Sequence, residues 1–193
     1  MKIQPVTLTG RAVQLVPLDK SHAEGLAAIA EPELFVHHFP PEQLTAAGFA
    51  DQINRLKALS NWRPFAILEM ASQAPVGITS YLDIQPANRG LEVGFTWMAK
   101  RVQGTKVNPE CKLLLLRHAF EDHKAVRVQL KTDRRNLHSQ RAIEKLGAVK
   151  EGVLRQHVIL PDGFLRDTVM YSIIDAEWPA VKARLIERLG YEL

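Results

Sequence analysis

A short polar segment, residues 100–107, has the residue types that could bind an anion. Gly104 would let the backbone approach a ligand closely, and Arg101 and Lys106 would add cationic donors nearby. The segment does not match a nucleotide P-loop, which needs a glycine, four further residues and then Gly-Lys-Ser/Thr, because Gly104 is followed by Thr105. These residues therefore suggest the binding of a phosphate, and the alternative is a tight turn that holds no ligand.

The apolar run after this segment is predicted to begin a helix. Asn108 stands at the N-cap position, with Pro109 at the first helical position and Glu110 in the first turn. The free N–H groups of a helix start face outward at the positive end of the helix dipole, where they can bind a phosphate without help from side chains. Cys111 follows in the same turn, and we interpret it as a small buried residue rather than a nucleophile.

A second polar pair stands at the start of a later predicted helix. Asn136 and Ser139 open this helix, where they could cap it or face a ligand, and Gly147 is placed to end it. In a β-loop-α-β-α unit both helix starts lie at the carboxyl ends of the strands, and ligands favour that edge of a sheet. We therefore expect this pair to lie near the first loop.

The strand before the first loop, residues 91–98, contains a glycine that suggests an irregularity. Gly94 indicates either a β-bulge or the close approach of another backbone. Simple alternation along the strand would divide its side chains between two faces. One face would hold Val93, Phe95 and Trp97, and the other Glu92, Gly94, Thr96 and Met98.

The elements that position these residues are predicted to alternate between strands and helices. Strands are predicted at 12–19, 64–70, 75–84, 91–98, 125–132, 152–160 and 166–174. Helices are predicted at 25–30, 45–60, 108 to about 118, 137–147 and 176–190. This order describes one α/β (α+β) domain over residues 1–193, with hairpins on both sides of a central parallel crossover.

Composition excludes several classes of protein. The chain has 193 residues, and no apolar run approaches the roughly 18 residues of a membrane helix. It lacks a signal-peptide pattern and has one cysteine, which rules out an internal disulfide and is typical of a cytoplasmic protein. The net charge of +4 is mild and dispersed, so it does not by itself indicate nucleic acid, although it would suit an anionic ligand. No metal is expected, because the pair His37-His38 lacks metal-ligand spacing.

Together, the two polar motifs resemble those of the GNAT acetyltransferases, in particular the RimJ/RimL-like branch that acetylates ribosomal proteins. The family's pyrophosphate loop is matched at Arg101 and Gly104, whereas Lys106 replaces a residue that is usually small. Asn136, Ser139 and the segment 145–147 match the family's later Asn-x-x-Ser and Lys-Leu-Gly block. The likeness spans roughly residues 8–178, which is nearly the whole chain.

This resemblance implies the GNAT fold, a mixed and mostly antiparallel sheet that splays between its central parallel strands, and acetyl-CoA as the donor. The pyrophosphate would bind the amides of residues 102–107, and the pantetheine arm would lie where strand 92–98 splays from strand 126–132. The Lys106 ammonium could pair with a CoA phosphate. The residues expected to contact CoA are Trp97, Met98, Arg101, Val102, Gln103, Gly104, Thr105, Lys106, Val107, Asn108, Asn136 and Ser139.

The resemblance also implies direct attack of an amine on the thioester in a ternary complex. Ser139 would contact the CoA sulfur, by similarity to the RimL-like branch, and Tyr171 is the alternative general acid. Glu92 could orient or deprotonate the amine if it faces the cleft, with a solvated carboxylate as its alternative, and Asp167 has the same ambiguity. His157 could line the acceptor pocket or occupy an ordinary strand position.

The identity of the acceptor stays open at this point. A protein N-terminus and a small-molecule amine are both compatible with the motifs, and specificity should come from the loop 31–49 and the hairpin 160–166. Two other classes of function also stay open, a non-catalytic module that binds or senses CoA and an RNA-associated factor. The chain could also form an oligomer.

Overall fold

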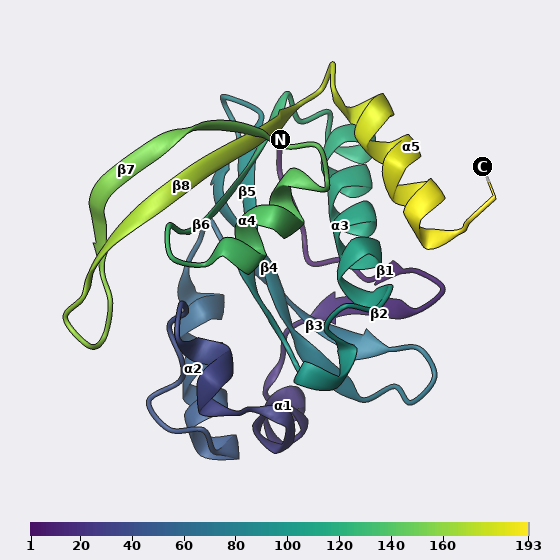
Figure 1. Cartoon of the computed structure of the whole chain (residues 1–193). Coiled ribbons are helices and arrows are strands. Elements are labelled where there is room, and N and C mark those ends of the chain that lie inside the picture. Colours follow the sequence, from purple (N-terminus) through teal and green to yellow (C-terminus); the bar gives the residue numbers. More distant parts are fainter. Residues whose placement is uncertain (193) are drawn as a thin grey trace.

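Apolar residues in alternation build one eight-stranded sheet, whose spatial order is β1-β2-β3-β4-β5-β6-β8-β7 (Figure 1). The structure is a computed structural model that describes residues 1–192. Every neighbouring pair of strands is antiparallel except β5 and β6. The strands are β1 (Leu8–Thr9), β2 (Val13–Pro17), β3 (Arg63–Glu69), β4 (Pro75–Gln85), β5 (Gly90–Met98), β6 (Arg127–Asp133), β7 (Val149–Ile159) and β8 (Leu165–Ile174).

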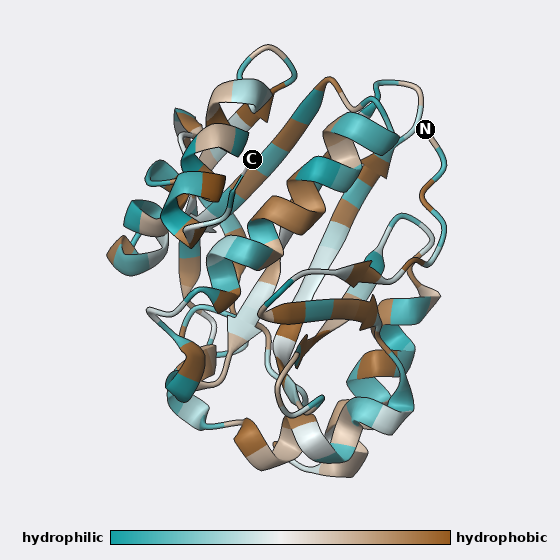
Figure 2. Ribbon diagram, turned by 90° about the vertical axis from the view of Figure 1, so that its right-hand side faces the viewer, coloured by the Kyte–Doolittle hydropathy of each residue, from teal (hydrophilic) through white to brown (hydrophobic). Residues whose placement is uncertain are grey.

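Helices lie on both faces of the sheet and pack against it through two buried hydrophobic clusters (Figure 2). One buried cluster joins α1 and α2 to the sheet through residues such as Leu26, Phe49 and Ile53. The other joins α3, α4 and α5 through residues such as Leu115 and Leu185. The helices are α1 (Ala23–Ile29), α2 (Ala46–Ala58), α3 (Val107–Arg117), α4 (Leu137–Glu144) and α5 (Trp178–Leu189), with a π-helical turn, His118–Asp122, after α3.

The predicted order of strands and helices is confirmed, with β1 as a short additional strand. No helix within residues 1–192 is long and apolar enough to cross a membrane. The predicted β3–β4 and β7–β8 hairpins are present. The β7–β8 hairpin extends beyond the rest of the sheet, as Figure 1 shows, and its tip is one of the two segments from which acceptor specificity is expected.

Strand β5 contains the bulge that Gly94 suggested. Ser80 pairs with Gly94 and Ile78 with Trp97, so β5 holds one residue more than β4 over this interval, and Phe95 has a φ of 50°. The bulge makes the expectation of simple alternation wrong. Val93 packs with the cluster around α3, whereas Trp97 packs on the opposite face with α1 and α2.

The two central strands separate after a short parallel contact. They pair only at Gly90–Arg127, Leu91–Val128 and Glu92–Gln129. Beyond Glu92, β5 stays with β4 up to Met98, while β6 stays with β8 up to Asp133. The expected splay is therefore present, with Glu92 at its apex.

The start of α3 differs from the sequence prediction. The helix begins at Val107 and its N-cap is Lys106, so Asn108 is already inside the first turn instead of capping it. The Thr105 hydroxyl accepts the N–H of Val107 at 3.3 Å and donates to the Val102 carbonyl at 2.7 Å. The helix therefore has no side-chain N-cap, and this threonine instead bridges the turn just before it.

Candidate active site

A cleft of about 830 Å³ lies where β5 and β6 part. Its walls come from these two strands, from the starts of α3 and α4, from the loop before α2 and from the first residues of β8. Most of the residues that were expected to contact CoA line it, namely Trp97, Met98, Gln103, Gly104, Asn108, Asn136 and Ser139. The cleft therefore joins the two motifs that are separated in the sequence.

One end of the cleft is a cradle of free backbone amides. Within residues 1–192, no acceptor is found for the N–H groups of Gly104, Thr105, Lys106 and Asn108. Gly104 has a φ of 75°, and a Cβ placed on it would meet nothing within 4 Å, so the space in front of the turn is open. Free amides at the positive end of a helix are suited to bind an anion such as a diphosphate.

The cationic side chains of this turn point elsewhere. Arg101 forms an ion pair with Glu69 at 2.9 Å, and Lys106 donates to the carbonyl of Leu189 at 2.6 Å. Neither side chain lines the cleft, so the expected pairing of Lys106 with a CoA phosphate does not fit this geometry. Val102 and Val107 are buried, and their N–H groups already donate to the Ala99 carbonyl at 3.1 Å and to the Thr105 hydroxyl at 3.3 Å.

A lysine that the sequence analysis did not single out lies in the cleft instead. The Lys112 side chain is buried and its Nζ donates to the Thr96 hydroxyl at 3.0 Å. Burial lowers the pKa of Lys112 from its ordinary value of 10.5 to about 8. Its signal in the sequence is a lone lysine ahead of four leucines in an apolar helix.

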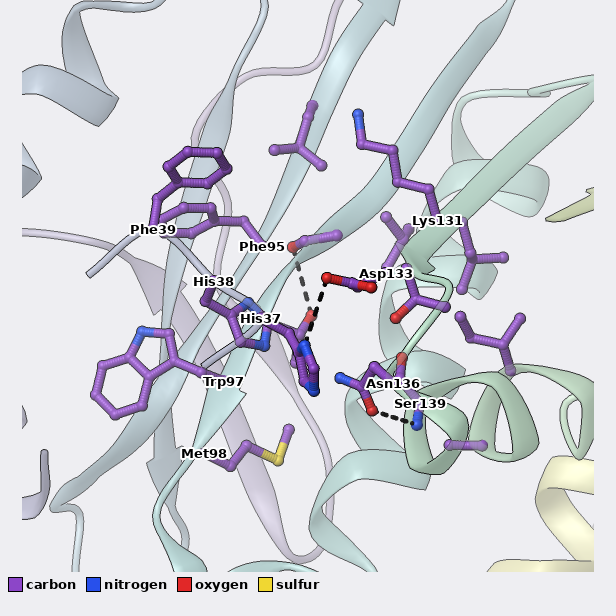
Figure 3. A pocket seen from close by; sticks show the side chains of 18 of the residues that line it. His37, His38, Phe39, Phe95, Trp97, Met98, Lys131, Asp133, Asn136 and Ser139 are labelled. Carbon is purple, nitrogen blue, oxygen red and sulfur yellow. Dashed lines mark hydrogen bonds and ion pairs between the residues drawn. The ribbon is translucent and has the colours of Figure 1, made fainter. Parts of the chain in front are cut away.

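Asn136 and Ser139 both face the cleft at the start of α4 (Figure 3). The Asn136 side chain is the N-cap, because its Oδ1 accepts the N–H of Ser139 at 2.9 Å. No hydrogen bond of the Ser139 hydroxyl is found in the described part of the chain. That hydroxyl is therefore free to donate to a ligand.

Glu92 is a buried carboxylate at the apex of the cleft, not a solvated one. Its side chain is 2% exposed, and its Oε2 accepts from Lys131 at 2.9 Å and from Gln129 at 3.2 Å. Its Oε1 lies above Gly94, where a Cβ would come within 2.7 Å of it. The glycine thus makes room for the carboxylate, which a residue with a side chain would displace.

The far end of the cleft holds polar residues from the loop before α2 and from β6. Asp133 is almost fully buried and forms an ion pair with Arg135 at 2.7 Å, and the Nδ1 of His37 lies 3.5 Å from it (Figure 3). His38 also lines the cleft, and burial lowers its pKa to about 4, so this imidazole is neutral at pH 7. Arg166, at the start of β8, completes this end. Sequence reasoning expected specificity from the segments that hold His37, His38 and Arg166, but it did not single out these side chains because they lack a recognisable spacing.

Tyr171 lies outside the cleft, so the expectation that it acts as general acid is not supported. It is fully buried and its hydroxyl donates to Glu144 at 3.0 Å. Burial, together with the bond to Glu144, raises the pKa of Tyr171 to about 12. Asp167 and His157 do not line the cleft either, and Asp167 accepts the N–H of Gln156 at 2.8 Å.

Two further expectations concern the role of Cys111 and the binding of a metal. Cys111 is fully buried, and burial raises the pKa of its thiol to about 12, which agrees with a packing residue rather than a nucleophile. Among the described residues, no group of three or more His, Cys, Asp and Glu side chains is arranged to hold a metal ion.

Comparison with known proteins agrees with this geometry. The acetyltransferase (GNAT) domain model matches residues 13–149. A crystal structure from T. thermophilus, provisionally described as an acetyltransferase, is 41% identical with a TM-score of 0.91 and covers 98% of this chain and 100% of that one.

Two relatives come from the ribosomal branch. YdaF of Bacillus subtilis (strain 168), provisionally described as a ribosomal N-acetyltransferase, is 29% identical over 106 residues, which are 55% of this chain and 57% of YdaF. This chain thus matches little more than half the length of its curated relative. The structure of Mycobacterium smegmatis RimJ in complex with CoA-disulfide is 20% identical, has a TM-score of 0.83 and covers 96% of this chain and 95% of RimJ, which supports the shared fold. The chain belongs to the GNAT family of acetyltransferases, which are acyltransferases.

Proposed function

We propose that this protein transfers an acetyl group from acetyl-CoA to a primary amine by direct attack in a ternary complex. The observation that carries this proposal is the single cleft that links free amides around Gly104 to a buried carboxylate, Glu92. An anionic carrier would bind at the first end, and an amine would react at the second.

The cleft has features that suit each part of CoA. The diphosphate would bind the free amides of Gly104, Thr105, Lys106 and Asn108. The pantetheine arm carries amides of its own, and it would follow the edge of β5 beyond Glu92, where the strand has no β6 partner. Lys112 would add a positive charge beside this path.

The chemistry of amide formation assigns roles to two side chains. The amine nitrogen forms a bond to the carbonyl carbon, the C–S bond breaks, and the amine must lose a proton while the thiolate gains one. Glu92, whose Oε2 lies 2.9 Å from the Lys131 ammonium, would take the proton directly or through a water molecule. Ser139, whose hydroxyl has no partner in the described residues, would donate to the departing sulfur.

Release of free thiol from acetyl-CoA, measured against a panel of N-terminal peptides and small amines, tests the proposal. Ser139→Ala and Glu92→Gln should each lower kcat roughly 10- to 100-fold, because each removes one proton-transfer group. The KM for acetyl-CoA should change little in either variant.

Matched controls are Ser21→Ala and Glu24→Gln, which alter exposed residues of the same types outside the cleft. Both controls should keep wild-type kinetics. If CoA binds but no amine is acetylated, the reading as a CoA-binding or CoA-sensing module would replace this one.

A further inference from the structure

Arg166 is a buried cation without an ion-pair partner in the described part of the chain. It is the second residue of β8, directly after the β7–β8 turn, and pairs with Val158. The residue is 7% exposed and lines the cleft. Its Nε is fully buried and has no hydrogen-bond partner, and no ion pair of its guanidinium is found within residues 1–192.

The carboxylates nearest to this end of the cleft already have other partners. Glu92 is paired with Lys131 at 2.9 Å, and Asp133 is paired with Arg135 at 2.7 Å. With Arg166 included, this part of the cleft holds two carboxylates and three cations from lysine and arginine. A guanidinium stays protonated near neutral pH, so one positive charge is left over.

Leaving the buried Nε of this guanidinium without a hydrogen bond is costly, and no opposite charge within residues 1–192 is close enough to form an ion pair with it. Its planar fork of N–H donors matches the two oxygens of a carboxylate. Burial lowers the pKa of Arg166, while Asp133 and Glu92 act in the opposite direction from a greater distance than an ion pair allows. A ligand carboxylate would supply the missing contact.

We propose that the acetyl acceptor carries a carboxylate near its amine and that Arg166 binds this carboxylate. The inference rests on the proposed function, because it places the acceptor in the same cleft. The negative side chain of Glu92 would then face the amine end of the acceptor, and Arg166 would face its acid end. The carboxylate could be the α-carboxylate of a free amino acid or an acidic side chain near the N-terminus of a peptide.

Two pairs of acceptors distinguish these sources. The first compares alanine with its α-amide, and the second compares a peptide beginning Ala-Asp with one beginning Ala-Asn. The kcat/KM of the acid should exceed that of its amide in one pair by roughly 100-fold, because a charge-assisted bidentate contact is lost in the amide. Arg166→Gln should abolish this ratio, Arg166→Lys should keep part of it, and Arg155→Gln, at an exposed arginine of β7, should leave it unchanged.

The outcomes separate this inference from the proposed function. Turnover of amines with equal kcat/KM for acid and amide in both pairs, or a ratio that persists in Arg166→Gln, would overturn the inference and leave the acetyltransferase intact. If no acceptor is turned over, calorimetry on CoA-saturated protein still measures acid and amide binding. Acid binding that requires Arg166 would support Arg166 as the carboxylate-binding residue without supporting acetyl transfer. The absence of such binding would refute the inference. Should Arg166→Gln fail to fold, Arg166→Lys tests the inference instead, and an undiminished ratio in that variant would overturn it.

Discussion

Replacing Lys112 by methionine should stabilise the free protein and weaken its binding of CoA. The ammonium of Lys112 is buried, and the hydroxyl of Thr96 is its hydrogen-bond partner. Methionine has a similar length and no charge, so Lys112→Met removes the desolvated cation and keeps most of its packing. Thr96 keeps its hydrogen bond with Thr79, at 2.8 Å.

The magnitude follows from the pKa. A lysine whose pKa falls from 10.5 in the unfolded chain to about 8 in the folded protein destabilises that protein by about 3 kcal/mol at pH 7. Between these two pKa values the unfolded chain binds more protons than the folded one, so wild-type stability rises with pH across this window. The penalty should fall to about 1 kcal/mol at pH 9.5. Subtracting about 1 kcal/mol for the lost hydrogen bond leaves a net gain of about 2 kcal/mol at pH 7.

Urea denaturation of both proteins between pH 6 and 9.5 measures this gain and its decrease with pH. At pH 7 the Tm of the variant should be higher by about 5 °C for a protein of this size. Calorimetric titration with CoA should show about tenfold weaker binding, because one charged donor is lost from the cleft. Lys2→Met, which changes an exposed lysine, is the control and should alter neither quantity.

Two results would refute this reasoning. A variant less stable than wild type at pH 7 would mean that Lys112 has a compensating partner and is not a desolvated cation. A stability gain that stayed constant from pH 6 to 9.5 would show that the gain comes from packing, because a lowered pKa requires the gain to decrease with rising pH.

Three further predictions concern the frame of the site. Glu110→Ala should lower the free energy of unfolding in urea by roughly 3–5 kcal/mol, because the buried carboxylate accepts hydrogen bonds from the N–H groups of residues 11–13 and from the Tyr191 hydroxyl. Glu110→Gln should lower this free energy by less. Gly104→Ala should cost only about 1 kcal/mol of stability for its positive φ, yet weaken CoA binding in calorimetry, since its methyl group would enter the cradle. Tyr171→Phe should leave kcat in the thiol-release assay unchanged, because the Tyr171 hydroxyl lies outside the cleft. It should reduce stability by about 1 kcal/mol, because the hydrogen bond to Glu144 is lost. A large fall in kcat would reinstate Tyr171 as a general acid.

Local patterns in the sequence were sufficient to predict the order of elements and the backbone part of the site. Hydrophobic periodicity and turn residues mark each strand and helix, and Gly94 marks the bulge in β5. Gly104 marks the cradle, because a backbone that must reach a ligand requires a residue without a side chain. Asn136 was recognisable as a cap because the geometry of an N-cap depends only on near neighbours.

Side-chain directions could not be predicted in the same way, because they depend on contacts between distant segments. Lys106 lies in the cradle by sequence, but its ammonium donates to Leu189, 83 residues away. Tyr171 follows strand alternation to the face covered by α4, where Glu144 binds it. The β5 bulge, although foreseen, also changed the face of every residue after it, so the alternation expected for Trp97 was wrong.

Two buried cations that line the cleft, Lys112 and Arg166, connect stability to function. Lys112 lies beside the path assigned to CoA and Arg166 lies at the end assigned to the acceptor, and neither has an ion-pair partner within residues 1–192. Each buried cation destabilises the free protein, and each is compensated only when an anionic group enters. Binding of either substrate should therefore stabilise the fold by more than its contacts with neutral residues would provide. The same electrostatic argument would explain both proposed specificities, one for a phosphorylated carrier beside Lys112 and one for an acidic acceptor at Arg166.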